Sequence, residues 1–154
     1  MELRYWDSMC FGYFLAKDPV GYDRCHSVLK AAEAGRLKIV TSSLTLTEVI
    51  KLKSRTKLPR DKEPMIRAFF KQPFIVVRLL DRKTAEFARD LVWEYDVPHK
   101  DAIHLATALL AGVVQLDTFD ADDLVKFSGK LGDPPLEIGN PPLREAQLDL
   151  LEKE

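Results

Sequence analysis

The stretch that most constrains the fold is a helix with almost no polar side, followed at once by a short apolar strand. The helix is predicted over residues 101–110, and Gly112 is its expected terminator. A helix that is apolar nearly all round lies inside a protein, and its alanines permit close packing against a sheet. Val113, Val114 and Leu116 then predict a strand that is buried on both faces.

The whole chain alternates between these two kinds of element. Strands are predicted at residues 3–6, 37–40, 74–80, 113–116 and 136–138, and helices at 9–16, 22–34, 44–56, 64–70, 84–95, 101–110 and 122–127. This alternation predicts an α/β fold, a three-layer α/β/α sandwich around a central, mainly parallel sheet. We expect one domain at residues 1–132 and a C-terminal extension at 133–154, packed on the domain or trailing from it, with a loosely docked helix within 141–154.

Composition and charge exclude several classes of protein. A net charge of −1 gives the chain no overall attraction for nucleic acid, so a polyanion has to be bound by local basic patches or a metal ion. Cys10 and Cys25 are too few for a disulfide framework and are not spaced as a zinc site, which favours a reduced, cytoplasmic location. No apolar run approaches the ~20 residues of a membrane span, so we expect no membrane association.

Four carboxylates that are far apart in the chain fall at one predicted edge of the sheet. Asp7 ends the first strand, and Glu48 lies in the helix after the second strand. Asp101 opens the buried helix, and Asp120 follows the fourth strand. Parallel strands joined by right-handed connections end on one edge, where open α/β sheets place their binding sites. The sequence therefore allows the four acids to converge.

Each acid also has a purely structural interpretation. Asp7 and Asp120 can cap the helices that follow them. Thr45 and Glu48 fit the S/T-x-x-E capping box, and Asp101 can complement a helix dipole. Several carboxylates within a few ångströms nevertheless raise one another's pKa, and a bound divalent cation removes that cost. Hard oxygen ligands favour Mg²⁺ or Mn²⁺ over zinc.

Four motifs carry these acids: YWDS with Asp7, SSLTLTEV with Glu48, KDAIHLATAL with Asp101, and VVQLDTFDADDL with Asp120 in a T-x-D element. Their order and spacing, from residue 3 to residue 128, resemble the PIN-domain family of metal-dependent nucleases, in particular the VapC-like ribonuclease toxins of prokaryotic toxin–antitoxin pairs. The resemblance implies a PIN-like fold for the domain. It also implies that these four acids are the catalytic residues and the ligands of one or two Mg²⁺ or Mn²⁺ ions.

The resemblance implies an activity and partners as well. The implied activity is endonucleolytic hydrolysis of RNA phosphodiester bonds, which leaves 5′-phosphate and 3′-hydroxyl ends. The implied partners are an antitoxin, whose tail fills the acidic groove, and a second copy of the chain in a homodimer. Aromatic residues of two helices are interface candidates, although core packing explains them at least as well: Phe11, Tyr13, Phe14, Phe69 and Phe70.

Residues near the four acids have less defined roles. The family often has an apolar residue at the position of Asp117, so this chain departs from the pattern there, and Asp117 is either a helper metal ligand or a solvated charge. Ser8 stands where the family often has a small polar residue that touches the site or caps a helix. Asp122 and Asp123 fit charges at a helix start. His104 fits a hydrogen-bonded core or subsite residue rather than a catalyst, and Trp6 and Trp93 fit core aromatics.

Basic residues are the candidates for contacts with substrate phosphates. A basic run follows the Glu48 helix and comprises Lys51, Lys53, Arg55, Lys57, Arg60 and Lys62. Each of these also fits a solvated surface. Lys51, Lys53 and Arg55 are the substrate-binding candidates from this run, together with Ser8. Lys100 and His99, which flank Asp101, are further candidates.

Two rival classes of function can be compared with the sequence. Magnesium-dependent phosphatases of the haloacid-dehalogenase type require D-x-D after the first strand, but this chain has Asp7-Ser8-Met9. Receiver domains require an acidic pair at that place, which is also missing. The alternative that the sequence leaves open is a catalytically weak PIN-like scaffold that binds RNA or protein without cutting.

Overall fold

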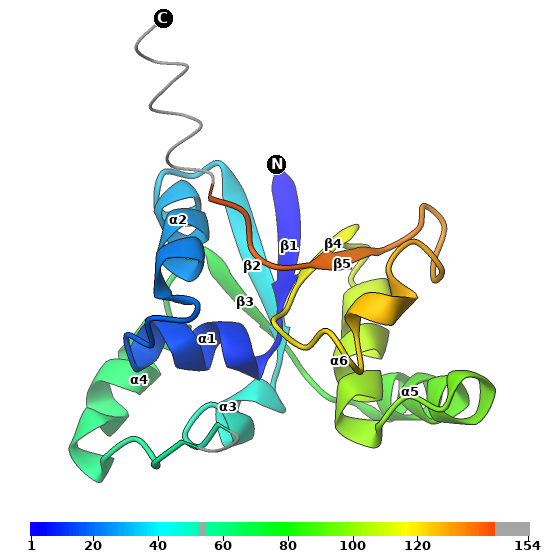
Figure 1. The fold of residues 1–154 in the computed structure, drawn as a ribbon, viewed down its shortest axis with the longest axis horizontal. Helices are drawn as coiled ribbons and strands as arrows, with labels where there is room; N and C mark the ends of the chain where they lie inside the picture. Colours follow the sequence, from blue (N-terminus) through cyan, green and yellow to red (C-terminus); the bar gives the residue numbers. More distant parts are fainter. Residues whose placement is uncertain (53–54, 144–154) are drawn as a thin grey trace, which may run out of the picture.

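A parallel β-sheet forms the middle layer of the fold (Figure 1). The computed structural model describes residues 1–52 and 55–143. Within this part of the chain the sheet has five strands in the order β3-β2-β1-β4-β5, and every neighbouring pair is parallel. The strands are β1 (Glu2–Trp6), β2 (Leu37–Ser42), β3 (Ile75–Arg78), β4 (Gln115–Asp117) and β5 (Glu137–Gly139).

Helices cover both faces of this sheet, which confirms the predicted three-layer α/β/α sandwich. One face carries α1 (Ser8–Leu15), α2 (Tyr22–Glu33) and α4 (Glu63–Phe70), and the other carries α5 (Arg82–Tyr95) and α6 (His99–Leu110) (Figure 1). The short helix α3 (Thr45–Glu48) lies beyond the carboxyl end of β2. The described residues also form two 3₁₀ turns, η1 (Arg60–Lys62) and η2 (Val125–Phe127).

Alternation along the strands divides the core into two clusters. Tyr5 and Val40 belong to the cluster that packs against α5 and α6, whereas Trp6 and Ile39 belong to the cluster that packs against α1 and α2. Neighbouring residues of a strand point to opposite faces of the sheet, so each strand contributes to both clusters. The helix α6 is buried as the sequence predicts, and it ends before Gly112, whose φ of +72° suits a residue without a side chain.

The helix predicted over residues 44–56 is too long, because α3 ends at Glu48. Four of the six residues from 45 to 50 are β-branched and have low helix propensity. The chain then turns toward α1, where Leu52 fills the space that a side chain at Gly12 would need. A Cβ atom at Gly12 would lie 2.4 Å from Leu52 Cδ1. A tertiary contact, which the local sequence does not encode, thus replaces the predicted helical turns.

Two smaller predictions about apolar residues are also wrong. Strand β4 begins at Gln115, and Val114 is 40% exposed rather than buried. Trp6 is a core residue as predicted, but Trp93 is 74% exposed on α5. Among the aromatic interface candidates, Phe11 and Phe70 are buried in the core, which favours packing as their role.

The segment predicted as a C-terminal extension, residues 133–154, contains strand β5 of the sheet. Strand β5 pairs in parallel with β4, so the sheet continues past residue 132. The helix predicted within 141–154 falls mostly on residues 144–154, which lie outside the described residues. Across residues 1–52 and 55–143, none of the helices combines the length and apolar character that crossing a bilayer requires.

Candidate metal and active site

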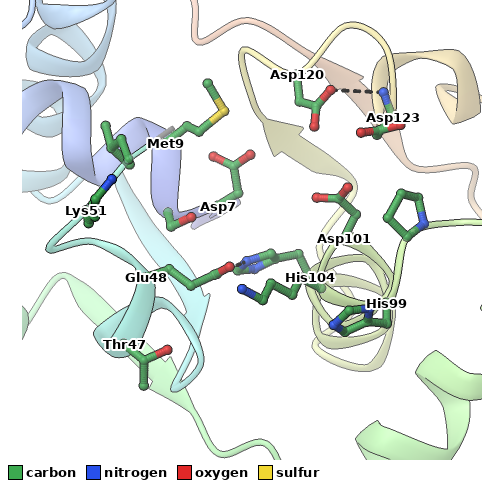
Figure 2. A pocket seen from close by; sticks show the side chains of 14 residues that line it. Asp7, Met9, Thr47, Glu48, Lys51, His99, Asp101, His104, Asp120 and Asp123 are labelled. Carbon is green, nitrogen blue, oxygen red and sulfur yellow. Dashed lines mark hydrogen bonds and ion pairs between the residues drawn. The ribbon is translucent and has the colours of Figure 1, made fainter. Parts of the chain in front are cut away.

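A cavity of about 450 Å³ opens at the edge where β1 and β4 end. All four predicted acids line it: Asp7 follows β1, Glu48 ends α3, Asp101 lies in the first turn of α6, and Asp120 follows β4. Their side chains point into the same space (Figure 2). The described residues lining the cavity are Asp7, Ser8, Met9, Thr47, Glu48, Lys51, Leu52, Pro98, His99, Lys100, Asp101, His104, Asp120 and Asp123.

Asp7 is both a helix cap and a cavity residue. Its Oδ1 accepts a hydrogen bond from the backbone N–H of Cys10 at 3.2 Å, which caps α1. Its Oδ2 accepts a bond from the Thr118 hydroxyl at 2.5 Å. Burial raises the pKa of the Asp7 carboxyl, and the charge of His104 and the Thr118 hydrogen bond offset part of that rise. Asp7 therefore caps α1 and also lines the cavity, and its role as a metal ligand and catalytic residue stays a prediction.

Asp101, Asp120 and Asp123 form the tightest acidic group in the cavity. Each offers a carboxylate oxygen, and these atoms lie within 4.8 Å of one another. The backbone N–H of Asp123 also donates to Asp120 Oδ1 at 2.9 Å. Burial, followed by the charge of Asp120, raises the pKa of Asp101 to about 6. Three carboxylates at this spacing repel one another when ionised, and their hard oxygen atoms suit a bound Mg²⁺ or Mn²⁺.

The position of Asp123 differs from its sequence interpretation. The sequence suggests a charge at the start of a helix, but residues 121–124 form a turn and Asp123 lies beside Asp120. The signal that would have identified it is the spacing of three residues between the two acids, which one turn brings onto the same side. Asp122, by contrast, is exposed and does not line the cavity.

Glu48 faces the cavity and does not cap its own helix. The residue before α3 is Leu44, which makes no side-chain cap, so the predicted capping box is wrong. The Thr45 hydroxyl bonds to the Thr41 hydroxyl at 2.7 Å instead. Glu48 Oε1 lies 2.8 Å from His104 Nε2, and Tyr5 Oη lies 2.6 Å from His104 Nδ1. His104 is 2% exposed and hydrogen-bonded, as the sequence suggests.

Asp117, which was predicted to be a helper metal ligand or a solvated charge, does not line the cavity. Its Oδ1 accepts from Arg4 Nη2 at 2.6 Å, and its Oδ2 accepts from Arg4 Nε and from Trp6 Nε1, both at 2.9 Å. The residue is 1% exposed, so it is not a solvated charge either. The structure therefore corrects both roles, because the chain supplies its own cation to this carboxylate.

The basic substrate-binding candidates separate into two groups. Lys51 and Lys100 line the cavity beside the acids, as do Ser8 and His99. Arg55 does not line it and forms an ion pair with Asp18 at 2.9 Å. Lys53 lies outside the described residues. The other members of the predicted run are exposed and away from the cavity: Lys57, Arg60 and Lys62.

Comparisons with known proteins support this fold. The PIN domain family model matches residues 5–130. One similar solved structure is a toxin–antitoxin complex from Klebsiella pneumoniae, with 21% identity over 90% of this chain and 98% of that chain and a TM-score of 0.60. A search of the curated proteins finds no match to this chain.

Two further solved structures share the fold. Mycobacterium tuberculosis VapC20, described as a sarcin–ricin loop cleaving toxin, has 16% identity over 77% of this chain and 91% of that chain, with a TM-score of 0.59. VapBC2 from Rickettsia felis, bound to a DNA fragment from its promoter, has 16% identity over 90% of this chain and 97% of that chain, with a TM-score of 0.58. At this identity the likeness shows a common fold.

Proposed function

The chain belongs to the PIN domain family, and on that premise we propose that it is a metal-dependent endoribonuclease that acts as the toxin of a toxin–antitoxin pair. The observation that carries the proposal is the convergence of Asp7, Glu48, Asp101 and Asp120 in one cavity. These acids come from four different elements, so no single helix cap or dipole explains why they meet. The names of the similar structures, a sarcin–ricin loop cleaving toxin among them, favour the same activity.

The residues of the cavity suit hydrolysis of a phosphodiester bond. Mg²⁺ or Mn²⁺, when bound, supplies a Lewis acid and lowers the pKa of a coordinated water. Asp101, Asp120 and Asp123 provide the closest set of ligand oxygens, and the same cavity is lined by Asp7, which follows β1, and by Glu48, which ends α3. The Thr118 hydroxyl holds the Asp7 carboxylate in place. In our proposal a carboxylate oxygen of this group also accepts the proton of the attacking water.

The same cavity has groups that suit the substrate. Lys51 and Lys100 bring positive charge to a site that is otherwise acidic, and both suit contacts with phosphates beside the scissile bond. Ser8 and His99 add neutral hydrogen-bonding groups to the lining. The proposed products carry 5′-phosphate and 3′-hydroxyl ends.

The proposal includes partners and a location. Two of the similar structures are a toxin–antitoxin complex and VapBC2, and we propose an antitoxin partner on that basis. The homodimer is proposed from the resemblance to VapC-like toxins alone. Both cysteines are free and buried, which suits a reduced, cytoplasmic setting.

Cleavage of a mixed structured RNA tests the activity. We expect cleavage by the purified protein with Mn²⁺, and loss of cleavage with EDTA or in Asp101→Asn. Asp122→Asn is the matched control, since this exposed acid adjoins the cluster without lining the cavity, and it should cleave as the wild type does. A folded wild-type protein that binds Mn²⁺ but cuts no RNA would support the alternative, a scaffold that binds without cutting.

A further inference from the structure

His104 connects the two helices that carry Asp101 and Glu48, which are α6 and α3. It lies on α6 three residues after Asp101, a spacing that places both side chains on one face of the helix. Its ring reaches Glu48 on α3, with 2.8 Å between Nε2 and Oε1 (Figure 2). The helix that supplies Asp101 is thereby bonded to the helix that supplies Glu48.

Helix α3 cannot fix the direction of the Glu48 side chain by itself. The helix has four residues, and no side chain caps its N-terminus, so it has little stability of its own. The bond between Thr45 and Thr41 anchors the start of α3, whereas Glu48 is its last residue. The Glu48 side chain is 18% exposed and would have several rotamers without a partner. The contact from His104 selects one of them.

The ring of His104 is itself held in one orientation. The Tyr5 hydroxyl bonds to Nδ1 at 2.6 Å, and Tyr5 is fully buried in the central strand β1. An ionised carboxylate only accepts hydrogen bonds, so the bond to Glu48 requires a proton on Nε2. This bond uses Oε1 of Glu48, and Oε2 is then the candidate ligand atom on this side of the cavity.

We propose that His104 is a positioning residue, which holds Glu48 toward the cavity through the Nε2–H···Oε1 hydrogen bond. Glu48 of α3 can then bind a divalent cation together with Asp101 of α6. The inference rests on the proposed function, because Glu48 has to act as a ligand of that cation. Residues that orient a metal ligand through a hydrogen bond commonly change metal affinity about 10-fold or more when they are replaced.

Two amide variants distinguish positioning from packing. In His104→Gln the side-chain amide lies near the position of Nε2 and can still donate to Glu48. In His104→Asn the amide lies near the position of Nδ1 and reaches Tyr5 instead. We expect calorimetric titration with Mn²⁺ alone to show affinity within about 3-fold of the wild type for the Gln variant and at least about 10-fold weaker affinity for the Asn variant. RNA cleavage at limiting Mn²⁺ should follow the same order.

A double-mutant cycle shows whether His104 acts through Glu48. In a Glu48→Gln background, His104→Asn should weaken Mn²⁺ binding by less than about 2-fold, because the ligand that it positions is already altered. His26→Asn is the control for replacing a histidine elsewhere, since His26 lies on α2 beside Phe14 and Tyr22. This control should bind Mn²⁺ as the wild type does.

The outcomes separate this inference from the proposed function. A wild-type protein that fails to bind Mn²⁺ overturns both. Wild-type binding with unchanged affinity in His104→Asn, or with equal losses in the Asn and Gln variants, overturns the role of His104 alone. Thermal unfolding verifies that each variant is folded. If His104→Asn does not fold, Glu48→Gln decides: it should weaken Mn²⁺ binding about 10-fold, and unchanged affinity overturns the inference.

Discussion

Asp7 and Asp117 stand at the ends of neighbouring strands, and both are buried, at 4% and 1% exposure. Asp117 ends β4 and pairs in register with Trp6, the residue that precedes Asp7. The guanidinium of Arg4 donates to both oxygens of Asp117. The donors to Asp7 are a backbone N–H and a hydroxyl, which are both neutral. The two carboxylates share an edge of the sheet but differ in what balances their charge.

The difference separates an acid with a structural role from an acid that we propose to be functional. Asp117 has an internal cation, so its charge is balanced within the protein and it holds β1 to β4. Burial raises the pKa of Asp7, because its neutral hydrogen-bond donors stabilise the ionised carboxylate less than water would. Because the charge of His104 offsets only part of this rise, we expect Asp7 to be the carboxylate that binds a cation from solution.

Replacing the structural acid should have the largest effect on stability. Asp117→Asn leaves the buried Arg4 guanidinium with Glu2 as its remaining acidic partner. We expect the free energy of unfolding to fall by about 3 kcal/mol, as measured by urea denaturation. The double variant Arg4→Met/Asp117→Leu should lose less, because it leaves no buried charge. A loss below about 1 kcal/mol in Asp117→Asn would make the two aspartates equivalent and remove the contrast.

Replacing Asp7 should have little effect on stability and a large effect on RNA cleavage. Asp7→Asn keeps an oxygen for the Cys10 N–H and removes a buried charge, so the free energy of unfolding should stay within about 1 kcal/mol of the wild type or rise. RNA cleavage should fall at least about 100-fold. Parallel denaturation curves and cleavage rates check both parts. An active Asp7→Asn variant would exclude Asp7 from the mechanism.

Replacing Thr118, whose hydroxyl donates to Asp7, should have an effect of intermediate size. Thr118→Val removes the hydroxyl that donates to Asp7 Oδ2 and accepts from the Asp120 backbone N–H at 3.0 Å. The free energy of unfolding should fall by about 1–2 kcal/mol, and Mn²⁺ affinity should fall as Asp7 and Asp120 lose their alignment. Thr118→Ser retains the hydroxyl and should retain both properties. Equal effects of Val and Ser would assign the role of Thr118 to packing of its methyl group.

The smallest expected effect is a pH dependence of stability. The pKa of Asp101 is raised from 3.8 to about 6, so the folded state binds this proton more tightly than the unfolded state does. Stability from this group therefore increases as the pH falls from 7 through 6 toward 4, and it is lowest above pH 6. Without metal, the melting temperature of the wild type should rise between pH 7 and pH 5 relative to that of Asp101→Asn.

Divalent metal should reverse this pH dependence. Mn²⁺ competes with the proton for the Asp101 carboxylate, so its stabilising effect should be larger at pH 7 than at pH 5. Melting curves recorded with and without Mn²⁺ at pH 7 and at pH 5 measure this stabilisation. Identical pH profiles for the wild type and Asp101→Asn would mean that Asp101 does not titrate in this range.

The elements that depend on periodicity were predictable from the sequence. The apolar run of α6 and the residues before and after it identify a buried helix, and the alternation of elements identifies a parallel sheet whose strands end on one edge. The convergence of Asp7, Glu48, Asp101 and Asp120 follows from that edge. Both predictions use local patterns and a general rule of topology.

The features that depend on tertiary contacts were not predictable. The role of Asp117 requires knowing that β4 lies beside β1, which brings Arg4 to its carboxylate. The early end of α3 reflects the docking of Leu52 against Gly12. The bond of Glu48 to His104 joins residues that are 56 positions apart. None of these pairs leaves a signal in a single sequence, because each contact forms only after the layers assemble.

The central position of β1 in the sheet has a consequence for biosynthesis. Strand β1 needs β2 on one side and β4 on the other, and β4, which begins at residue 115, is synthesised long after β1. Asp120 and Asp123 are made later still, so the acidic group cannot assemble until most of the chain is available. Sheets that pair distant strands also fold slowly. A nascent chain stopped before β4 therefore carries Asp7, Glu48 and Asp101 but lacks the strand that brings the remaining acids to them.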